Sequence, residues 1–130
     1  MNTTSERKII STPNAPTAIG PYAQAVSYGN LLFVSGMIPI DPKTGELLTG
    51  NFEAEVTLVL ENLKAVLEAG GMGMKNVLKA SVFLKEIALF GKFNEIYGRY
   101  FGDVLAARET IQVAKLPRDA SIEISVICGK

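Results

Sequence analysis

The spacing of apolar residues changes period several times along this chain, and these changes limit the possible folds more than any other feature. Between residues 52 and 67 apolar side chains recur every three or four positions. They are Phe52, Val56, Val59, Leu60, Leu63, Val66 and Leu67. That spacing predicts an amphipathic helix with one buried face. Asn51 is suited to cap its start and Gly70 to end it.

Other segments alternate between apolar and polar residues, which is typical of strands. The alternation is clearest over residues 76–85, where Ala80, Val82 and Leu84 occupy every second position. Shorter alternating runs predict strands near residues 110–113 and 122–126. Upstream, residues 24–28 and 31–35 flank Gly29-Asn30, a pair that suits a tight hairpin in which Gly29 adopts a positive φ.

A second helix is predicted over residues 90–101, where helical spacing returns. Its stripe is aromatic as well as aliphatic and consists of Phe90, Phe93, Ile96, Tyr97, Tyr100 and Phe101. We interpret this stripe as core packing first and as a ligand surface second.

The predicted order is therefore ββ-α-β-α-ββ, an α+β fold in which two helices cover one face of a mixed sheet. A chain of 130 residues suits one domain spanning residues 1–130. The polar residues 1–8 are predicted to be flexible, and the proline-rich residues 11–21 to form an extended arm. Residues 116–120 join the last two strands, a length that permits antiparallel neighbours.

Composition excludes several classes of function. Thirteen basic residues balance 13 acidic ones, and the basic residues are scattered, which argues against nucleic-acid binding. No apolar segment is long enough to span a bilayer and the start lacks a signal sequence, so we expect a cytoplasmic protein. The chain has no histidine and one cysteine, Cys128, which we interpret as a small buried hydrophobe. We expect neither a metal ion nor an organic cofactor.

Arg108 and Glu123 are the most suggestive polar pair, because each lies near the start of one of the last two strands. If these strands are neighbours, both side chains can reach one sheet face. Arginine offers a planar fork of donors that matches a carboxylate, and glutamate can hold or deprotonate a water molecule. An ordinary cross-strand ion pair is the competing interpretation.

Several local motifs occur in a familiar order. They are Asn14-Ala15-Pro16, Ile19-Gly20-Pro21-Tyr22-Ala23-Gln24-Ala25, Phe33-Val34-Ser35-Gly36-Met37-Ile38-Pro39, Phe93-Asn94-Glu95-Ile96-Tyr97, Arg108, Gln112-Val113-Ala114-Lys115-Leu116-Pro117 and Ile122-Glu123-Ile124. From about residue 9 to residue 127 the chain resembles the RidA (YjgF) family of reactive intermediate deaminases, also called 2-iminobutanoate/2-iminopropanoate deaminases.

The resemblance implies a chorismate-mutase-like fold assembled as a homotrimer, with clefts between subunits that bind a small imino or keto acid. It implies that Arg108 clamps the substrate carboxylate and that Glu123, with the main-chain carbonyl of Thr110, holds the attacking water. The further residues implied to line the cleft are Tyr22, Ser35, Gly36 and Asn94. Without the family, Tyr22 can equally anchor the N-terminal arm, Ser35-Gly36 can end a strand, and Asn94 can be a solvated polar residue.

The implied activity is hydrolysis of reactive enamines and imines, such as 2-aminoacrylate, 2-iminopropanoate and 2-iminobutanoate, to 2-keto acids and ammonia, with no cofactor. A noncatalytic, carboxylate-binding regulatory module is the main alternative. A ribonuclease or translation inhibitor is a further one, and the neutral net charge and missing histidine argue against the ribonuclease.

Three positions depart from the family pattern. Ala106 stands where proline is common, Met37 where glutamine is frequent, and Glu109 where a small residue is usual. Glu109 can in principle neutralise Arg108, but strand alternation predicts that the two side chains point to opposite faces.

Overall fold

The computed structural model describes residues 6–130, and its elements alternate between strands and helices. The strands are β1 (Arg7–Ile10), β2 (Ala25–Tyr28), β3 (Leu31–Met37), β4 (Val77–Leu84), β5 (Ala107–Gln112) and β6 (Ile122–Gly129). The α-helices are α1 (Phe52–Ala69) and α2 (Phe90–Phe101). Short 3-10 turns are η1 (Met74–Asn76), η2 (Ile87–Leu89) and η3 (Pro117–Asp119).

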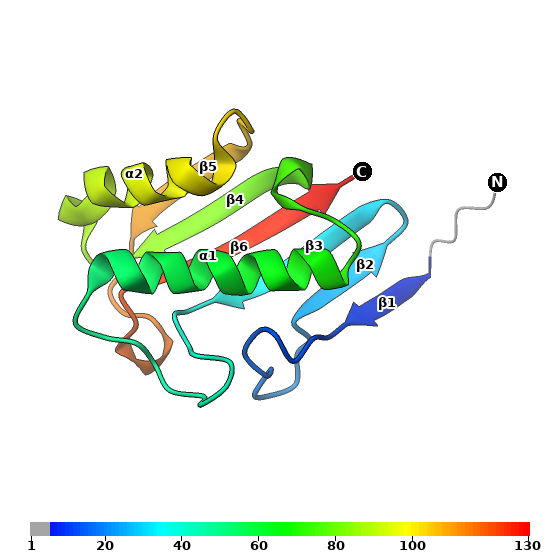
Figure 1. The fold of residues 1–130 in the computed structure, drawn as a ribbon, viewed down its shortest axis with the longest axis horizontal. Coiled ribbons are helices and arrows are strands. Elements are labelled where there is room, and N and C mark those ends of the chain that lie inside the picture. The colour runs from blue at the N-terminus through cyan, green and yellow to red at the C-terminus, as the bar shows by residue number, and fades with distance from the viewer. Residues whose placement is uncertain (1–5) are drawn as a thin grey trace.

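The strands form one mixed sheet in the order β1-β2-β3-β6-β4-β5. Most neighbouring pairs are antiparallel, whereas β4 and β5 run parallel. The parallel pair requires a crossover connection, and α2 provides it. Figure 1 shows the sheet edge-strands β1 and β5 at opposite sides of the molecule.

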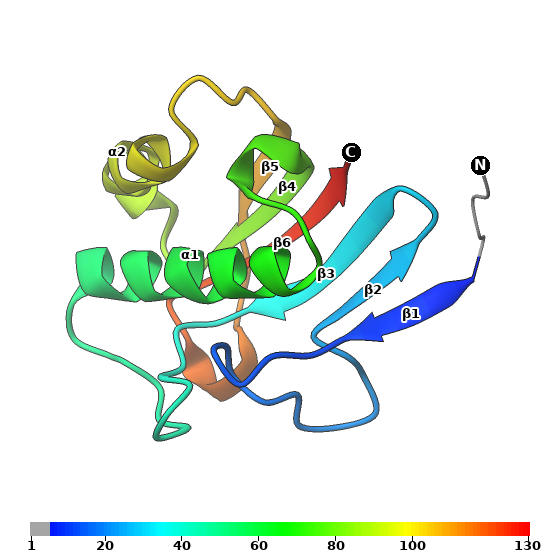
Figure 2. The same cartoon turned by 45° about the vertical axis from the view of Figure 1, so that its right-hand side comes forward.

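Both helices lie on the same face of this sheet (Figures 1 and 2), as the sequence predicts. The core fills the space between the two layers. Leu32, Val82 and Ile124 from the sheet meet Leu63 and Phe93 from the helices, and all are fully buried. Cys128 is also buried, as predicted, and burial raises the pKa of its thiol to about 11.

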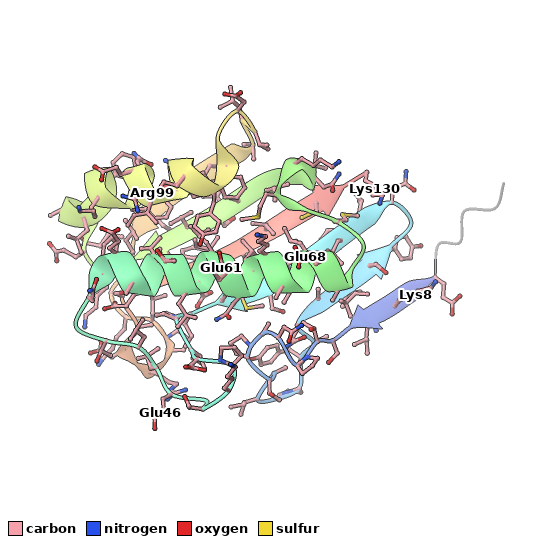
Figure 3. All side chains as sticks on the ribbon, in the orientation of Figure 1. Lys8, Glu46, Glu61, Glu68, Arg99 and Lys130 are labelled. Carbon is pink, nitrogen blue, oxygen red and sulfur yellow. The ribbon has the colours of Figure 1, made fainter. Side chains whose placement is uncertain are left out.

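Helix α1 follows the predicted stripe closely. The Asn51 side chain caps it by accepting a hydrogen bond from the Ala54 N–H at 3.0 Å, and the helix ends at Ala69, before Gly70. Glu61 and Glu68 lie on its outer surface, where Figure 3 labels them. The predicted hairpin is also present, with Gly29 at φ 60° between β2 and β3.

Glu55 joins the start of α1 to the start of β6. This carboxylate is buried, accepts a hydrogen bond from the Asn51 N–H at 2.8 Å, and accepts a second from the Ser121 hydroxyl. Ser121 lies between η3 and β6, so the contact fixes the loop that leads into β6.

Two expectations are wrong. Arg7 and Lys8 do not belong to a flexible tail, because they pair with Tyr28 and Ser27 in β1; residues 1–5 lie outside the described residues. The last two strands are not neighbours either, because β4 lies between β5 and β6. Within residues 6–130, neither helix combines the length and apolar character needed to cross a membrane.

Candidate functional site

An irregularity in β3 creates the most distinctive local geometry of the sheet. Val34 pairs with Val126 and Met37 with Ile124, so β3 holds one residue more than β6 over the same stretch. Ser35 and Gly36 are the residues within this bulge. A bulge redirects side chains and occurs often beside active sites.

The bulge makes room for the Glu123 side chain against the backbone of Gly36. A Cβ atom at position 36 would lie 2.2 Å from Oε2 of Glu123 and 2.7 Å from its Cδ, so no larger residue fits without moving the carboxylate. A side chain at position 36 would therefore displace the Glu123 carboxylate from its present place. The sequence alone suggested only that Ser35-Gly36 ends a strand or lines a cleft.

Glu123 is half-buried, and burial raises the pKa of its carboxyl above the ordinary value of 4.5. Removal from water disfavours the charged form of a carboxylate. A carboxylate with a raised pKa is a stronger base than an exposed one, which suits it to accept a proton from water.

The N-terminal arm forms the opposite wall. Buried Gln24 holds it through its side chain, which accepts from the Thr12 N–H at 2.7 Å and donates to the Pro16 carbonyl at 2.7 Å. The Ser35 hydroxyl donates to the Ala23 carbonyl at 2.6 Å, which joins the bulge to the same segment. Tyr22 is 55% exposed, and its hydroxyl accepts from the Ile19 N–H at 3.4 Å.

These walls enclose a pocket of about 280 Å³. Four predicted site residues line it, namely Tyr22, Ser35, Gly36 and Glu123, and we call them the pocket group. The remaining lining residues are Pro16, Thr17, Ala18, Ile19, Gln24, Met37, Ile38, Ile40, Pro117 and Arg118. Sequence reasoning missed Arg118, because nothing in the local pattern distinguishes it from an ordinary loop residue.

Arg108 does not line this pocket; it lies in β5, and its side chain reaches toward α2. Its guanidinium carbon is 4.8 Å from the ring centroid of Tyr97, 5.4 Å from that of Phe93 and 5.8 Å from that of Phe90. Such rings attract the cation through their negative faces. The aromatic stripe of α2 therefore has two roles: Phe93, Ile96 and Phe101 are buried in the core, and part of the stripe supports Arg108.

No carboxylate among residues 6–130 lies within ion-pair distance of Arg108. Glu109 points to the other sheet face, as alternation predicts, where it contacts Lys79 at 3.1 Å and accepts from the Ser81 hydroxyl. Burial raises the pKa of Tyr97, and the nearby positive charge of Arg108 partly opposes that rise. The guanidinium is thus oriented and has no acidic partner in the described chain.

Thr110 and Asn94 lie on the same side of the molecule as Arg108. Thr110 is two residues further along β5, so it shares the face of Arg108, and its hydroxyl oxygen is buried without a hydrogen-bond partner in the described chain. Asn94 lies on α2 one turn after Phe90, which places it on the helix face that contacts Arg108. We call Asn94, Arg108 and Thr110 the arginine group.

The pocket group and the arginine group do not meet within one chain. Arg108 pairs in register with Ala80, which is buried under the helices, as Val82 and Leu84 are further along β4. Glu123 pairs with Phe83, which lies between Val82 and Leu84. Alternation along β4 therefore places the two charged side chains on opposite faces of the sheet. The expectation that neighbouring strands bring them together is wrong, because it assumed that β5 and β6 pair.

The arrangement of potential metal ligands in the described chain differs from that of a metal site. Within residues 6–130, no group of three or more histidine, cysteine, aspartate or glutamate side chains is arranged to hold a metal ion.

Comparison with known proteins identifies the family. The model of the family described as Endoribonuclease L-PSP matches residues 12–129, which is nearly the whole chain. This chain belongs to the RidA/YjgF family. Among its RidA/YjgF relatives, a RutC family protein of Pyrococcus horikoshii is 48% identical over 124 residues, covering 95% of this chain and 98% of the relative.

Two further relatives carry more specific descriptions. The 2-iminobutanoate/2-iminopropanoate deaminase of mouse is 45% identical over 121 residues, covering 93% of this chain and 90% of that protein. The crystal structure of E. coli TdcF with bound serine is similar to this structure, with a TM-score of 0.90 and 39% sequence identity. The match covers 95% of this chain and 98% of the TdcF chain. The fold of this RidA/YjgF family member agrees with the chorismate-mutase-like fold that the sequence resemblance implies.

Proposed function

We propose that this RidA/YjgF family protein hydrolyses small imino acids, such as 2-iminopropanoate and 2-iminobutanoate, to 2-keto acids and ammonia. The observation that carries the proposal is the half-buried Glu123 carboxylate, packed on Gly36 inside a pocket and raised in pKa by burial. The 45% identity to the mouse protein described as a 2-iminobutanoate/2-iminopropanoate deaminase supports it.

The chemistry needs a positioned water and a held substrate. Glu123 orients a water molecule and accepts its proton while the water oxygen bonds to the carbon of the protonated imine and the C=N π electrons move to nitrogen. Glu123 then returns this proton to the nitrogen of the carbinolamine, and the C–N bond breaks to release ammonia. The C=O bond forms as the hydroxyl proton passes back to the Glu123 carboxylate. Orientation and electrostatic stabilisation are what the protein contributes to these steps.

Arg108 holds the substrate carboxylate in this proposal. Its guanidinium rests on aromatic rings and has no acidic partner in residues 6–130, so its planar donor fork is available for an external carboxylate. Asn94 contacts the ligand beside Arg108, and the main-chain carbonyl of Thr110 helps to hold the water.

Because Arg108 and Glu123 lie on opposite faces of one sheet, we propose that each site is completed by two subunits of a cytoplasmic homotrimer. The arginine group of one subunit then faces the pocket group of the next. The sheet face away from the helices carries exposed apolar side chains, including Phe33 and Ile111, which association would cover.

Replacement of Arg108 tests the proposed activity. Arg108→Ala removes two charge-assisted hydrogen bonds of about 1.5–3 kcal/mol each, so kcat/KM should fall by about 10²–10⁴. The assay generates the imine in situ with a serine or threonine dehydratase and compares keto-acid release with the spontaneous rate. Arg99→Ala is the control, because Arg99 pairs with Glu53 on the helix surface and should retain parental activity.

Two results would contradict this proposal. If Arg108→Ala accelerates hydrolysis as the parent does while keeping its oligomeric state, the carboxylate clamp is wrong. If the parent binds a keto acid but does not accelerate hydrolysis, the protein is a noncatalytic carboxylate-binding module.

A further inference from the structure

Arg118 lies in η3 and lines the same pocket as Glu123. Among the described residues that line this pocket, Arg118 is the one cation and Glu123 the one anion. Most of the others are apolar, including Met37, Ile38 and Ile40. The pocket therefore presents two opposite charges along a largely apolar wall.

Arg118 and Glu123 do not form an ion pair with each other, although both line the pocket. Each charge is therefore available to a different group of one ligand, with the reacting carbon at Glu123 and an anionic group at Arg118.

Arg118 keeps donors free for a ligand. Its Nη1 donates to the Gly45 carbonyl at 3.1 Å, and a guanidinium has five N–H groups. No carboxylate in residues 6–130 lies within ion-pair distance of it. The adjacent Asp119 is occupied by Lys85 at 2.7 Å.

The backbone that presents Arg118 is held in an uncommon conformation. Arg118 and Asp119 have φ values of 57° and 60°, which lie in the left-handed region. Aspartate is found there more often than most residues, whereas arginine rarely is. Two hydrogen bonds at Ser121, directly after this turn, secure it: the Lys85 N–H donates to the Ser121 carbonyl at 3.0 Å, and the Ser121 hydroxyl donates to buried Glu55. Backbone strain of this kind persists where the surroundings enforce it, and it clusters at ligand sites.

We propose that Arg118 is a specificity-determining residue that binds a second anionic group, carried on the side chain of a dicarboxylic imino acid. Arg108 of the neighbouring subunit holds the carboxylate next to the imine, Glu123 faces the imine carbon, and Arg118 holds the distal carboxylate. The assignment of the reacting end rests on the proposed function, whereas the distal contact can be tested by binding alone.

A matched pair of keto acids provides the test. 2-Oxoglutarate and 2-oxopentanoate have the same chain length and differ in the distal carboxylate, and calorimetric titration of each into the full oligomer gives the ratio of their Kd values. The parent should bind 2-oxoglutarate more tightly. Arg118→Asn, which tolerates a positive φ, should reduce that preference by about tenfold to a hundredfold, as expected for one charge-assisted hydrogen bond.

Lys115→Asn is the control, because Lys115 lies in the same loop but does not line the pocket, and it should leave the ratio at the parental value. Arg118→Lys should give an intermediate ratio, since it keeps the charge but loses the fork. The proposal is overturned if the parent shows no preference or binds neither acid, if Arg118→Asn keeps the parental ratio, or if it weakens both acids equally, as a purely structural bridge to Gly45 would. Normal selectivity in binding without imine turnover would reject the proposed activity alone.

Discussion

Replacement of Gly36 tests whether its contact with Glu123 positions the carboxylate. Gly36→Ala places a Cβ where Oε2 of Glu123 now lies, so the carboxylate must move. We expect kcat for imine hydrolysis to fall by about 10², the lower end of what a positioned general base contributes. Gly91→Ala is the control: nothing lies within 4 Å of its added Cβ, and activity should be parental. A fully active Gly36→Ala protein would show that this contact does not position the base.

The raised pKa of Glu123 has opposite consequences for activity and stability. The general base must be ionised, so kcat/KM should decline with falling pH at a higher pH than the ordinary carboxyl value of 4.5 predicts. For stability, burial disfavours the charged form in the folded protein, a penalty that is present near neutral pH and disappears as pH falls below 4.5.

Glu123→Gln should therefore bring imine hydrolysis close to the spontaneous rate at every pH, while leaving the protein at least as stable as the parent at pH 7. The stability difference should shrink toward pH 4. Thermal unfolding at both pH values checks the second part, and a Glu123→Gln protein that is markedly less stable at pH 7 than at pH 4, relative to the parent, would contradict it.

For single residues, the sequence predicts which face of the sheet a side chain points to better than it predicts which residues that side chain contacts. Alternation correctly separated Glu109 from Arg108, because that inference needs only the period of one strand. The contact between Gly36 and Glu123 depends on a bulge in one strand and the register of another, and no local pattern contains that information.

At the scale of elements, the connection between α1 and β6 depends on Glu55. Glu55→Ala leaves the Ser121 hydroxyl and the Asn51 N–H without their partner, so the free energy of unfolding should fall by about 1–3 kcal/mol. Urea denaturation at fixed protomer concentration measures this change. Glu68→Ala, an exposed substitution on the same helix, should stay within about 0.5 kcal/mol of the parent. Equal effects of the two substitutions would mean that the Glu55 contacts contribute nothing to stability.

Both helices and five of the six strands were predictable, because each has a clear apolar period. Strand β1 was missed because its four residues, Arg7–Ile10, are exposed or only partly buried and do not alternate. The separation of β5 from β6 was missed for another reason. A short connection permits adjacency but does not require it, and here α2 carries the chain across so that β5 pairs in parallel with β4.

At the scale of the whole molecule, the arginine group and the pocket group occupy opposite faces of one sheet. Sequence motifs pointed to residues of both groups, but not to their separation by the sheet. In the proposed function, Arg108 of one subunit therefore acts with Glu123 of its neighbour.

Hybrid oligomers test this central claim most directly. Arg108→Ala and Glu123→Gln subunits are produced together with different affinity tags, hybrids carrying both tags are purified, and imine hydrolysis is measured against the spontaneous rate. In any mixed ring of three, one site joins a subunit that retains Arg108 to a neighbour that retains Glu123, so hybrids should recover about one third of parental activity. Each variant alone should remain close to the spontaneous rate. Hybrids no more active than the separate variants would contradict a site shared between subunits.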